Sequence, residues 1–390
     1  MDTSQTITYV IFLIFTGTAV LSTMALFTRQ SLLVAYIVLG ALIGPYGFRL
    51  VDNTDIIKQA GDIGIIFLLF LLGLHLHPQN LFHSLRKMSL IAFASSALFF
   101  IMGFVPSYFF GYSILQSCII GVATMFSSTI IGIKLLPTTI LHHQHTGELV
   151  VSILLLQDIL AIAVLLALEA MTGSAVSIHH ISIIVGAFPL LVIGSYAFQR
   201  YVLSPLLSRF DKIHEYIFIL SIGWCLCVTE LSAYLGLSAE IGAFIAGVAL
   251  AANPISFYIA ESLKPLRDFF LVIFFFTVGA SFDFGYLSVV AVPACVLAAL
   301  VLLLKPCIFK WLLYRSGEVK EISWEIGVRL GQMSEFSLLV IYLALETNLL
   351  PLETTYMVEA AIIITFIVSC YWTAMRYPTP LASTDKLRRD

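Results

Sequence analysis

The stretch SILLLQDILAIAV, residues 152–164, places a glutamine and an aspartate in a run that is otherwise almost entirely aliphatic. A charged side chain at the centre of a membrane-spanning helix costs roughly 2.5–3.5 kcal/mol on insertion scales, and such residues usually mark ion or proton paths. Burial favours the neutral carboxyl group, whereas a nearby cation favours the charged carboxylate. Asp158 is therefore expected to hold either a proton or a monovalent cation, with Gln157 adding a neutral oxygen. The alternative is that Asp158 is a neutral or ion-paired packing residue.

Other charges also lie in apolar segments. Lys305 stands just before Pro306 in VLLLKPCIFKWLLYR, and we interpret it as a counter-charge to the Asp158 site when no metal ion is bound. The alternative is a lysine that snorkels to the nearby helix end. Arg329 follows Glu325 by four residues, which favours a structural ion pair. Glu335 either pairs with a basic residue or helps to build the site.

Two polar stretches predict places where helices break. ATMFSST (123–129) contains Ser127, Ser128 and Thr129, and RLGQMSEF (329–336) contains glycine, Gln332 and Glu335. Unwound backbone is tolerated inside a membrane only where it is buried in protein or lines a cavity. Two breaks that meet would direct carbonyls and half-helix dipoles at a bound cation. Alternatively, the hydroxyl groups bond to their own helices and hold neighbouring helices together.

The composition indicates an integral membrane protein. Hydrophobic residues make up 60% of the chain and charged residues 11%, against about 25% charged in soluble domains. The net charge of −3 gives no basic surface for nucleic acid. The chain contains neither HExxH nor a nucleotide-binding glycine motif, so no cofactor is expected. His75, His77 and the LHHQH cluster (141–145) are interpreted as loop histidines, and all six cysteines as free and buried.

A membrane-spanning helix needs about 20 mostly apolar residues, and this criterion predicts thirteen spans. They are 7–27, 31–45, 56–76, 87–110, 113–136, 148–171, 179–203, 213–235, 237–252, 265–283, 286–312, 322–346 and 353–375. Apart from Lys305 and Arg329, the Lys and Arg residues lie in the loops or close to the span ends, and two of them, Arg49 and Lys58, are on the N-terminal side against sixteen on the opposite side. The positive-inside rule then predicts an N-terminus outside and a C-terminus in the cytoplasm.

An internal repeat appears when the sequence is shifted by about 206 residues. Gly73 then falls on Gly279, LGALIG (39–44) lies close to IGAFIAG (241–247), and residues 127–129 fall on 333–335. Spans 1–6 thus correspond to spans 8–13, with span 7 as a linker. Because equivalent helices are seven spans apart, the two halves are predicted to have opposite orientations. Inverted repeats of this kind are typical of secondary transporters, which bind their substrate at the midplane.

The chain resembles a known family through five motifs. These are SILLLQDILAIAVLLAL, GLSAEIGAFIAGVALA, FFFTVGASFDFG, GLHLHPQNL and GQMSEFSLLV. Together they resemble the membrane part of the monovalent cation:proton antiporter-2 family, closest to the bacterial glutathione-gated potassium efflux systems. The resemblance covers residues 30–375.

The resemblance implies the sodium/proton antiporter fold: an all-α polytopic membrane protein with thirteen helices, two inverted repeats and crossed discontinuous helices. It also implies a homodimer in the bacterial inner membrane. The implied parts are scaffold helices 1–3 (1–85), core helices 4–6 (86–175), linker helix 7 (176–210), scaffold helices 8–10 (211–284), core helices 11–13 (285–378) and a cytoplasmic tail (379–390). The family's paired polar positions correspond to Gln157 and Asp158, its lysine to Lys305, and its hydroxyl break to Ser127, Ser128 and Thr129.

Two departures from the family pattern concern regulation and the second break. The family's regulatory nucleotide-binding domain is not in this sequence, which is expected to be either part of a longer protein or a member without that domain; a separate regulatory subunit is also possible, and control by glutathione or nucleotide is not inferred. The usual GQGGEF reads Gln332-Met333-Ser334 at its centre, which leaves the position of the second break open.

The predicted function is transport rather than enzymatic catalysis. We expect electroneutral exchange of one monovalent cation, most simply potassium leaving the cell, for one proton at Asp158, with alternating access by movement of the core. The alternatives are sodium/proton exchange and channel-like potassium efflux without protons. An intramembrane aspartyl protease is a further alternative, but it needs two catalytic aspartates at facing mid-helix positions, and Asp158 is the one aspartate that we find at such a position.

Overall fold

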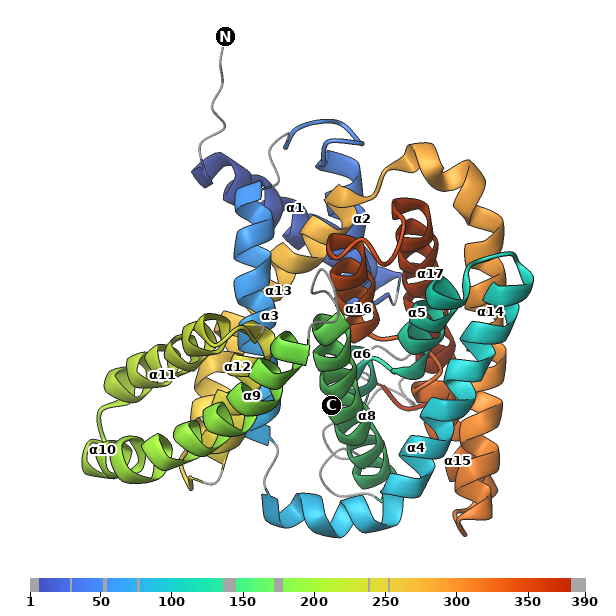
Figure 1. Ribbon diagram of the computed structural model, residues 1–390. Helices are drawn as coiled ribbons and strands as arrows, with labels where there is room; N and C mark the ends of the chain where they lie inside the picture. The colour runs from blue at the N-terminus through green and yellow to red at the C-terminus, as the bar shows by residue number, and fades with distance from the viewer. Residues whose placement is uncertain are drawn as a thin grey trace. The chain divides into compact units, whose positions relative to one another are not determined.

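The computed structural model describes residues 7–28, 30–51, 55–75, 78–134, 136, 145–171, 178–237, 239–251 and 253–379. The described residues are almost entirely helical (Figure 1). His77, His142 and His143, which we interpreted as loop histidines, lie outside the described residues. His75 is the last residue of one helix (Asp55–His75) and His145 the first of another (His145–Met171), so for these two the loop interpretation was wrong.

Each of the thirteen predicted spans coincides with one helix or with one interrupted helix. The helices are α1 (Ile7–Phe27), α2 (Leu32–Ile43), α3 (Asp55–His75), α4 (Pro78–Phe109), α5 (Ile114–Met125), α6 (Thr129–Lys134), α8 (His145–Met171), α9 (Ile178–Phe198), η1 (Gln199–Leu203), α10 (Ser204–Arg209), α11 (His214–Tyr234), α12 (Ala239–Ala251), α13 (Ser256–Ser281), η2 (Phe284–Tyr286), α14 (Leu287–Arg315), α15 (Lys320–Arg329), α16 (Glu335–Glu346) and α17 (Leu352–Arg376). The largest differences from the prediction are α4 and α13, which both begin nine residues early.

Length and composition support insertion in a membrane. Within the described residues, seven helices are long and apolar enough to cross a bilayer alone, and α2, α5 and α12 are shorter apolar helices. The prediction of an integral membrane protein is confirmed. Cys227, Cys295 and Cys307 are exposed, so the expectation that all six cysteines are buried was wrong: spanning helices also carry apolar residues on faces that meet lipid.

The inverted repeat is visible in the helix bounds. Moving α5 forward by 206 residues makes it begin at Lys320, where α15 begins, and moving α6 by the same amount makes it begin at Glu335, where α16 begins. The same shift carries Pro78–Phe109 onto residues 284–315, the range of η2 and α14. The repeat that was predicted from weak sequence similarity is therefore a repeat of helix boundaries.

The chain divides into two compact units. Unit 1 comprises Met1–Phe15, Gly40–His83 and Leu166–Ser281, and unit 2 comprises Thr16–Leu39, Ser84–Leu165 and Phe282–Asp390. Residues 16–39, which the resemblance assigns to the scaffold, fall in unit 2 with the predicted core helices.

Unit 1 is assembled around α3, which packs against α12 and α13. Glycines make the closest approaches possible. A Cβ at Gly247 of α12 would collide with the Phe70 carbonyl oxygen and would lie 2.9 Å from the Gly73 Cα of α3. The motifs that suggested the repeat, around Gly73 and in IGAFIAG, thus serve helix packing.

We expect Gly247→Ala to destabilise unit 1, because the added methyl group has no space between α3 and α12. Overpacking of this kind costs about 1–3 kcal/mol. A lower melting temperature in detergent would show this. Gly223→Ala in α11 is the control, because a Cβ there meets nothing within 4 Å; equal stability of the two variants would contradict the prediction.

Unit 2 contains both interrupted helices. Within this unit α14 packs against α15 and α17, and α5 packs against α16 (Figure 1). The candidate site lies entirely in unit 2.

Candidate functional site

The first helix break separates α5 from α6. Phe126, which follows the last residue of α5, is extended with φ −97° and ψ 149°. Ser128 precedes α6, and its Oγ accepts a hydrogen bond from the backbone N–H of Ile131 at 3.1 Å. This is an N-cap interaction that satisfies a backbone donor at the start of a helix. The hydroxyl of Ser128 therefore helps to begin the second half-helix.

The second break separates α15 from α16. Ser334 has φ −116° and ψ 157°, and its Oγ accepts a hydrogen bond from the Phe336 N–H at 3.1 Å. In return, the Ser334 N–H donates to the Ser337 Oγ at 3.3 Å. The shift of 206 residues places Ser128 on Ser334. Each repeat thus restarts its broken helix after an equivalent capping serine, and both predicted breaks are confirmed.

The two breaks contact one another directly. Ser127 Oγ, in the first break, donates to the backbone oxygen of Leu330 at 2.9 Å. Ser337 Oγ, at the start of α16, donates to the backbone oxygen of Ala123 at 2.5 Å. The discontinuous helices therefore cross where their backbones are unwound. Ser127 and Ser337 thus donate to the other interrupted helix and not to their own, which agrees with the part of the alternative that has hydroxyl groups hold neighbouring helices together.

Lys305 of α14 joins the two breaks. Its fully buried Nζ donates to the backbone oxygen of Phe126 at 2.6 Å and to that of Gln332 at 3.2 Å, and it lies 4.8 Å from the Phe99 ring centroid. The 206-residue shift places Phe126 on Gln332 and Phe99 on Lys305. The ammonium group thus binds equivalent carbonyls of both repeats and does not snorkel to the helix end.

Glycines let α14 approach the second break closely enough for this contact. A Cβ at Gly327 would lie 2.6 Å from the Pro306 carbonyl oxygen, and one at Gly331 would lie 3.0 Å from the Pro306 Cγ. Larger side chains at these positions would push α15 away from α14 and therefore away from Lys305, which belongs to α14.

Asp158 of α8 is 2% exposed and lies beside α6 and α16. The Thr129 hydroxyl is within hydrogen-bonding distance of both carboxylate oxygens, at 3.0 and 3.1 Å. Glu335, the first residue of α16, is close enough to Asp158 for the two carboxylates to repel each other electrostatically. Among the described contacts, Lys305 forms no ion pair with Asp158. A proton or a cation would relieve the repulsion between the two carboxylates.

Gln157 stabilises the first break. Its Oε1 accepts from the Ser127 N–H at 3.1 Å, and its Nε2 donates to the Met125 carbonyl at 3.4 Å. These are backbone groups that the end of α5 leaves without helical partners. Of the five predicted binding residues, Thr129 contacts Asp158, whereas Gln157, Ser127 and Ser128 make the hydrogen bonds that shape the break.

We expect Gln157→Leu to lower stability, because an unsatisfied buried polar group costs about 1–3 kcal/mol. Gln157→Glu should lose less, because its protonated carboxyl group can still accept from the Ser127 N–H and donate to the Met125 carbonyl. Thermal melting of the three proteins in one detergent measures the difference. If Gln157→Leu melted like the wild type but bound cations more weakly, Gln157 would be a ligand rather than a support for the break.

Arg329 forms the predicted structural pair. Its guanidinium group contacts Glu325 Oε1 at 2.8 Å and donates to the Pro378 carbonyl at 3.0 Å, and it lies 5.4 Å from the Tyr377 ring centroid. The end of α15 is thereby tied to the segment that follows α17.

Two residues of α17 that the sequence analysis overlooked support the second break. Thr365 Oγ1 accepts from the Met333 N–H at 3.2 Å, and Ser369 Oγ donates to Gln332 Oε1 at 2.9 Å. Thr365 therefore does for Met333 what Gln157 does for Ser127. Their spacing of four residues, on one helical face, was the available signal.

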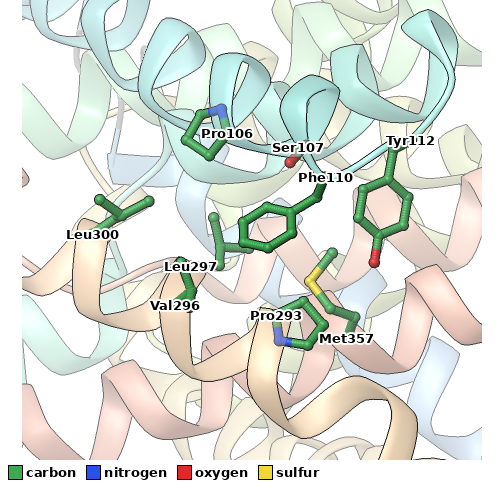
Figure 2. A pocket seen from close by; sticks show the side chains of 9 residues that line it. All are labelled: Pro106, Ser107, Phe110, Tyr112, Pro293, Val296, Leu297, Leu300 and Met357. Carbon is green, nitrogen blue, oxygen red and sulfur yellow. The ribbon is translucent and has the colours of Figure 1, made fainter.

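A small pocket lies at one end of unit 2, and Figure 2 shows Phe110, Tyr112, Pro293 and Met357 around it. Burial raises the pKa of Tyr112, and the negative charge of Glu353 raises it further. The lining is mostly apolar, and none of the predicted binding residues belongs to it. This pocket is not the candidate ion site.

Crossed helix breaks, a buried lysine on their carbonyls and a buried carboxylate beside them define a secondary ion transporter built from inverted repeats. The chain belongs to the sodium/hydrogen exchanger family, whose transmembrane model matches residues 11–375. This result confirms the resemblance to monovalent cation:proton antiporters.

Individual relatives agree with this assignment. The chain is 31% identical over 356 residues to the glutathione-regulated potassium-efflux system protein KefC of Enterobacter sp. (strain 638), covering 86% of this chain and 54% of that protein. It thus spans about half the length of that relative. It is 25% identical to the iron transporter MagA of Paramagnetospirillum magneticum, covering 88% of this chain and 80% of MagA.

The fold is also found in a solved structure. The sodium proton antiporter MjNhaP1 of Methanocaldococcus jannaschii superposes with a TM-score of 0.68 at 17% identity, and the match covers 96% of both chains. The predicted antiporter fold is confirmed.

Proposed function

We propose that the protein exchanges one potassium ion for one proton at Asp158. The observation that carries this proposal is the placement of Asp158, buried beside both helix breaks with Thr129 on its carboxylate and Glu335 nearby. A proton on Asp158 relieves the repulsion from Glu335, and so does a cation bound by the carboxylates and the Thr129 hydroxyl. Because either one suffices, the two compete.

The neighbours of Asp158 favour electroneutral exchange. Gln157 cannot ionise, and its amide is engaged with the backbone. Lys305 is held by two carbonyls and, within the described contacts, not by Asp158. We propose that Lys305 keeps one protonation state throughout the cycle, so that one positive charge moves each way.

The transport movement that we propose is an elevator-like shift of unit 2, which carries Asp158 from one side of the membrane to the other. The division of the chain into two compact units supports it. The distribution of lysine and arginine supports an N-terminus outside and a C-terminus in the cytoplasm. We also propose a homodimer in the bacterial inner membrane, by analogy with the family.

Potassium is the preferred cation because of the relatives. Several KefC relatives are about 30% identical to this chain, and their name gives potassium efflux. Sodium is the alternative, because the family model and the similar structure are both named for sodium.

The test is transport by purified protein in liposomes that contain a pH-sensitive dye. Adding potassium outside should move protons out faster than adding sodium, and choline should move none. Faster exchange with sodium would support the alternative. Potassium flux without proton movement would indicate a channel. A rate that rises strongly with membrane potential would contradict electroneutral exchange.

A further inference from the structure

Glu359 of α17 is a buried carboxyl group that the exchange site does not use. The residue is 0% exposed. Its Oε2 accepts a hydrogen bond from the Tyr342 hydroxyl of α16 at 3.1 Å. Its Oε1 is buried and has no hydrogen-bond partner among the described residues. Unit 2 thus contains a buried acid besides Asp158, and the exchange site does not explain it.

The surroundings of Glu359 do not suit a permanent negative charge. Tyr342 is the titratable group that faces it, and Tyr342 in turn interacts with Tyr356. Within the described residues, no lysine, arginine or histidine forms an ion pair with Glu359. Burying an uncompensated charge costs several kcal/mol, which a single hydroxyl donor does not offset. The group therefore holds a proton for much of the time, and Oε1 is the oxygen available to carry it.

The pair lies between the helix break and one end of unit 2. Tyr342 is seven residues beyond Glu335 on α16, and Glu359 is six residues before Thr365 on α17. At 1.5 Å per residue these separations are about 10 Å and about 9 Å along the two helices. The residues between α16 and α17, 347–351, lie further on in the same direction. In the proposed orientation that direction is outward.

We propose that Glu359 and Tyr342 form a second proton-binding site, which relays protons between the outer solution and the Asp158 site. The Glu359 Oε1–H bond breaks and, at the end of the relay, an O–H bond forms on the Asp158 carboxylate, while the Tyr342 O–H stabilises the Glu359 carboxylate that remains. Water on the outer side then returns a proton to Glu359. The carboxyl group ends each cycle as it began, so the exchange ratio is unchanged. The direction of this relay rests on the proposed function.

The transport test compares Glu359→Gln, which keeps the shape of the side chain but holds no proton, with Glu353→Gln. Glu353 is exposed on the first turn of the same helix, and its replacement should leave exchange unchanged. Glu359→Gln should slow exchange by roughly a hundredfold at high outer pH, the lower end of the range that proton transfer by a positioned acid supplies. The exchange rate of Glu359→Gln should depend on the inner pH as the rate of the wild type does. An unchanged dependence on outer pH would overturn the proposal.

A measurement without transport separates this proposal from the proposed function. Infrared difference spectra should show a protonated carboxyl group that Glu359→Gln removes and that potassium leaves in place. The protonated carboxyl signal that Asp158→Asn removes should instead disappear when potassium binds. If Asp158→Asn still exchanges ions, the proposed function fails but the Glu359 signal can still be measured.

A Glu359 signal that persists at every pH at which exchange occurs would mean a structural hydrogen bond and not a relay. Should Glu359→Gln fail to fold, Tyr342→Phe gives the same test. It keeps the acid but removes the hydroxyl that stabilises its charged form. The variant should also slow exchange at high outer pH, and wild-type behaviour would overturn the proposal.

Discussion

Asp158→Asn is expected to abolish cation-driven proton movement while leaving the protein folded. Asparagine has nearly the same shape as aspartate and still accepts the Thr129 hydrogen bond, which is 3.0 Å long in the wild type. It binds no exchangeable proton and offers a cation only a neutral oxygen. The coupling depends on competition between a proton and a cation for one carboxylate. The variant should therefore bind neither the exchangeable proton nor the cation.

The measurement is dye-reported proton movement in liposomes after addition of potassium. Asp211→Asn is the matched control, because Asp211 lies exposed in the turn before α11 and should transport normally. Melting temperatures must be compared in parallel, so that loss of transport is not mistaken for loss of folding. Undiminished coupling in Asp158→Asn would refute the assignment of the site. The remaining acid, Glu335, is not expected to replace Asp158, because the Thr129 hydroxyl is bonded to Asp158.

Lys305→Met is expected to destabilise unit 2 more than any other single side-chain truncation proposed here. The wild-type ammonium group binds the carbonyls of Phe126 and Gln332. Hydrogen bonds to charged groups contribute about 1.5–3 kcal/mol each, and buried acceptors that lose their donors add a desolvation cost. Both helix breaks should loosen together, because one side chain holds both. We expect a large fall in melting temperature and slow or absent exchange.

A matched control lies on the same helix. Lys310 stacks 5.0 Å from the Trp324 ring centroid and is only partly buried, so Lys310→Met should cost far less. Lys305→Gln separates charge from hydrogen bonding, because it can still donate to one carbonyl. If Lys305→Met melted like the wild type, the breaks would not depend on this contact. If Lys305→Gln changed the number of protons moved per cation, Lys305 would take part in the exchange itself.

Much of the fold could be predicted from the order of the residues. Long apolar runs are visible in the sequence itself, so hydropathy located the thirteen segments. The asymmetric distribution of basic residues predicted their orientation, and the internal repeat located the linker between its two halves. Polar interruptions in 123–129 and 329–336 predicted both breaks, and left the position of the second open, because unwound backbone in a membrane needs polar surroundings or burial in protein. Asp158 was identifiable because a carboxylate near the centre of a span has few purely structural uses.

Other features depended on partners that are distant in sequence or belong to the backbone. Lys305 binds carbonyls 179 and 27 residues away, and a carbonyl has no signature in the sequence. Gln157 looked like a cation ligand, but its amide supports the backbone of the first break. Glu359 went unnoticed because it stands only six residues into its predicted span, a position typical of helix ends.

The sequence by itself thus determined which segments enter the membrane, where two of them break and which acid lies near the middle, because these are local consequences of polarity and helix geometry. The tertiary structure decided which polar groups meet at the crossing. A hydrogen bond depends on distance and direction between two atoms, and only packing of α5, α8, α14, α16 and α17 against one another brings those atoms together.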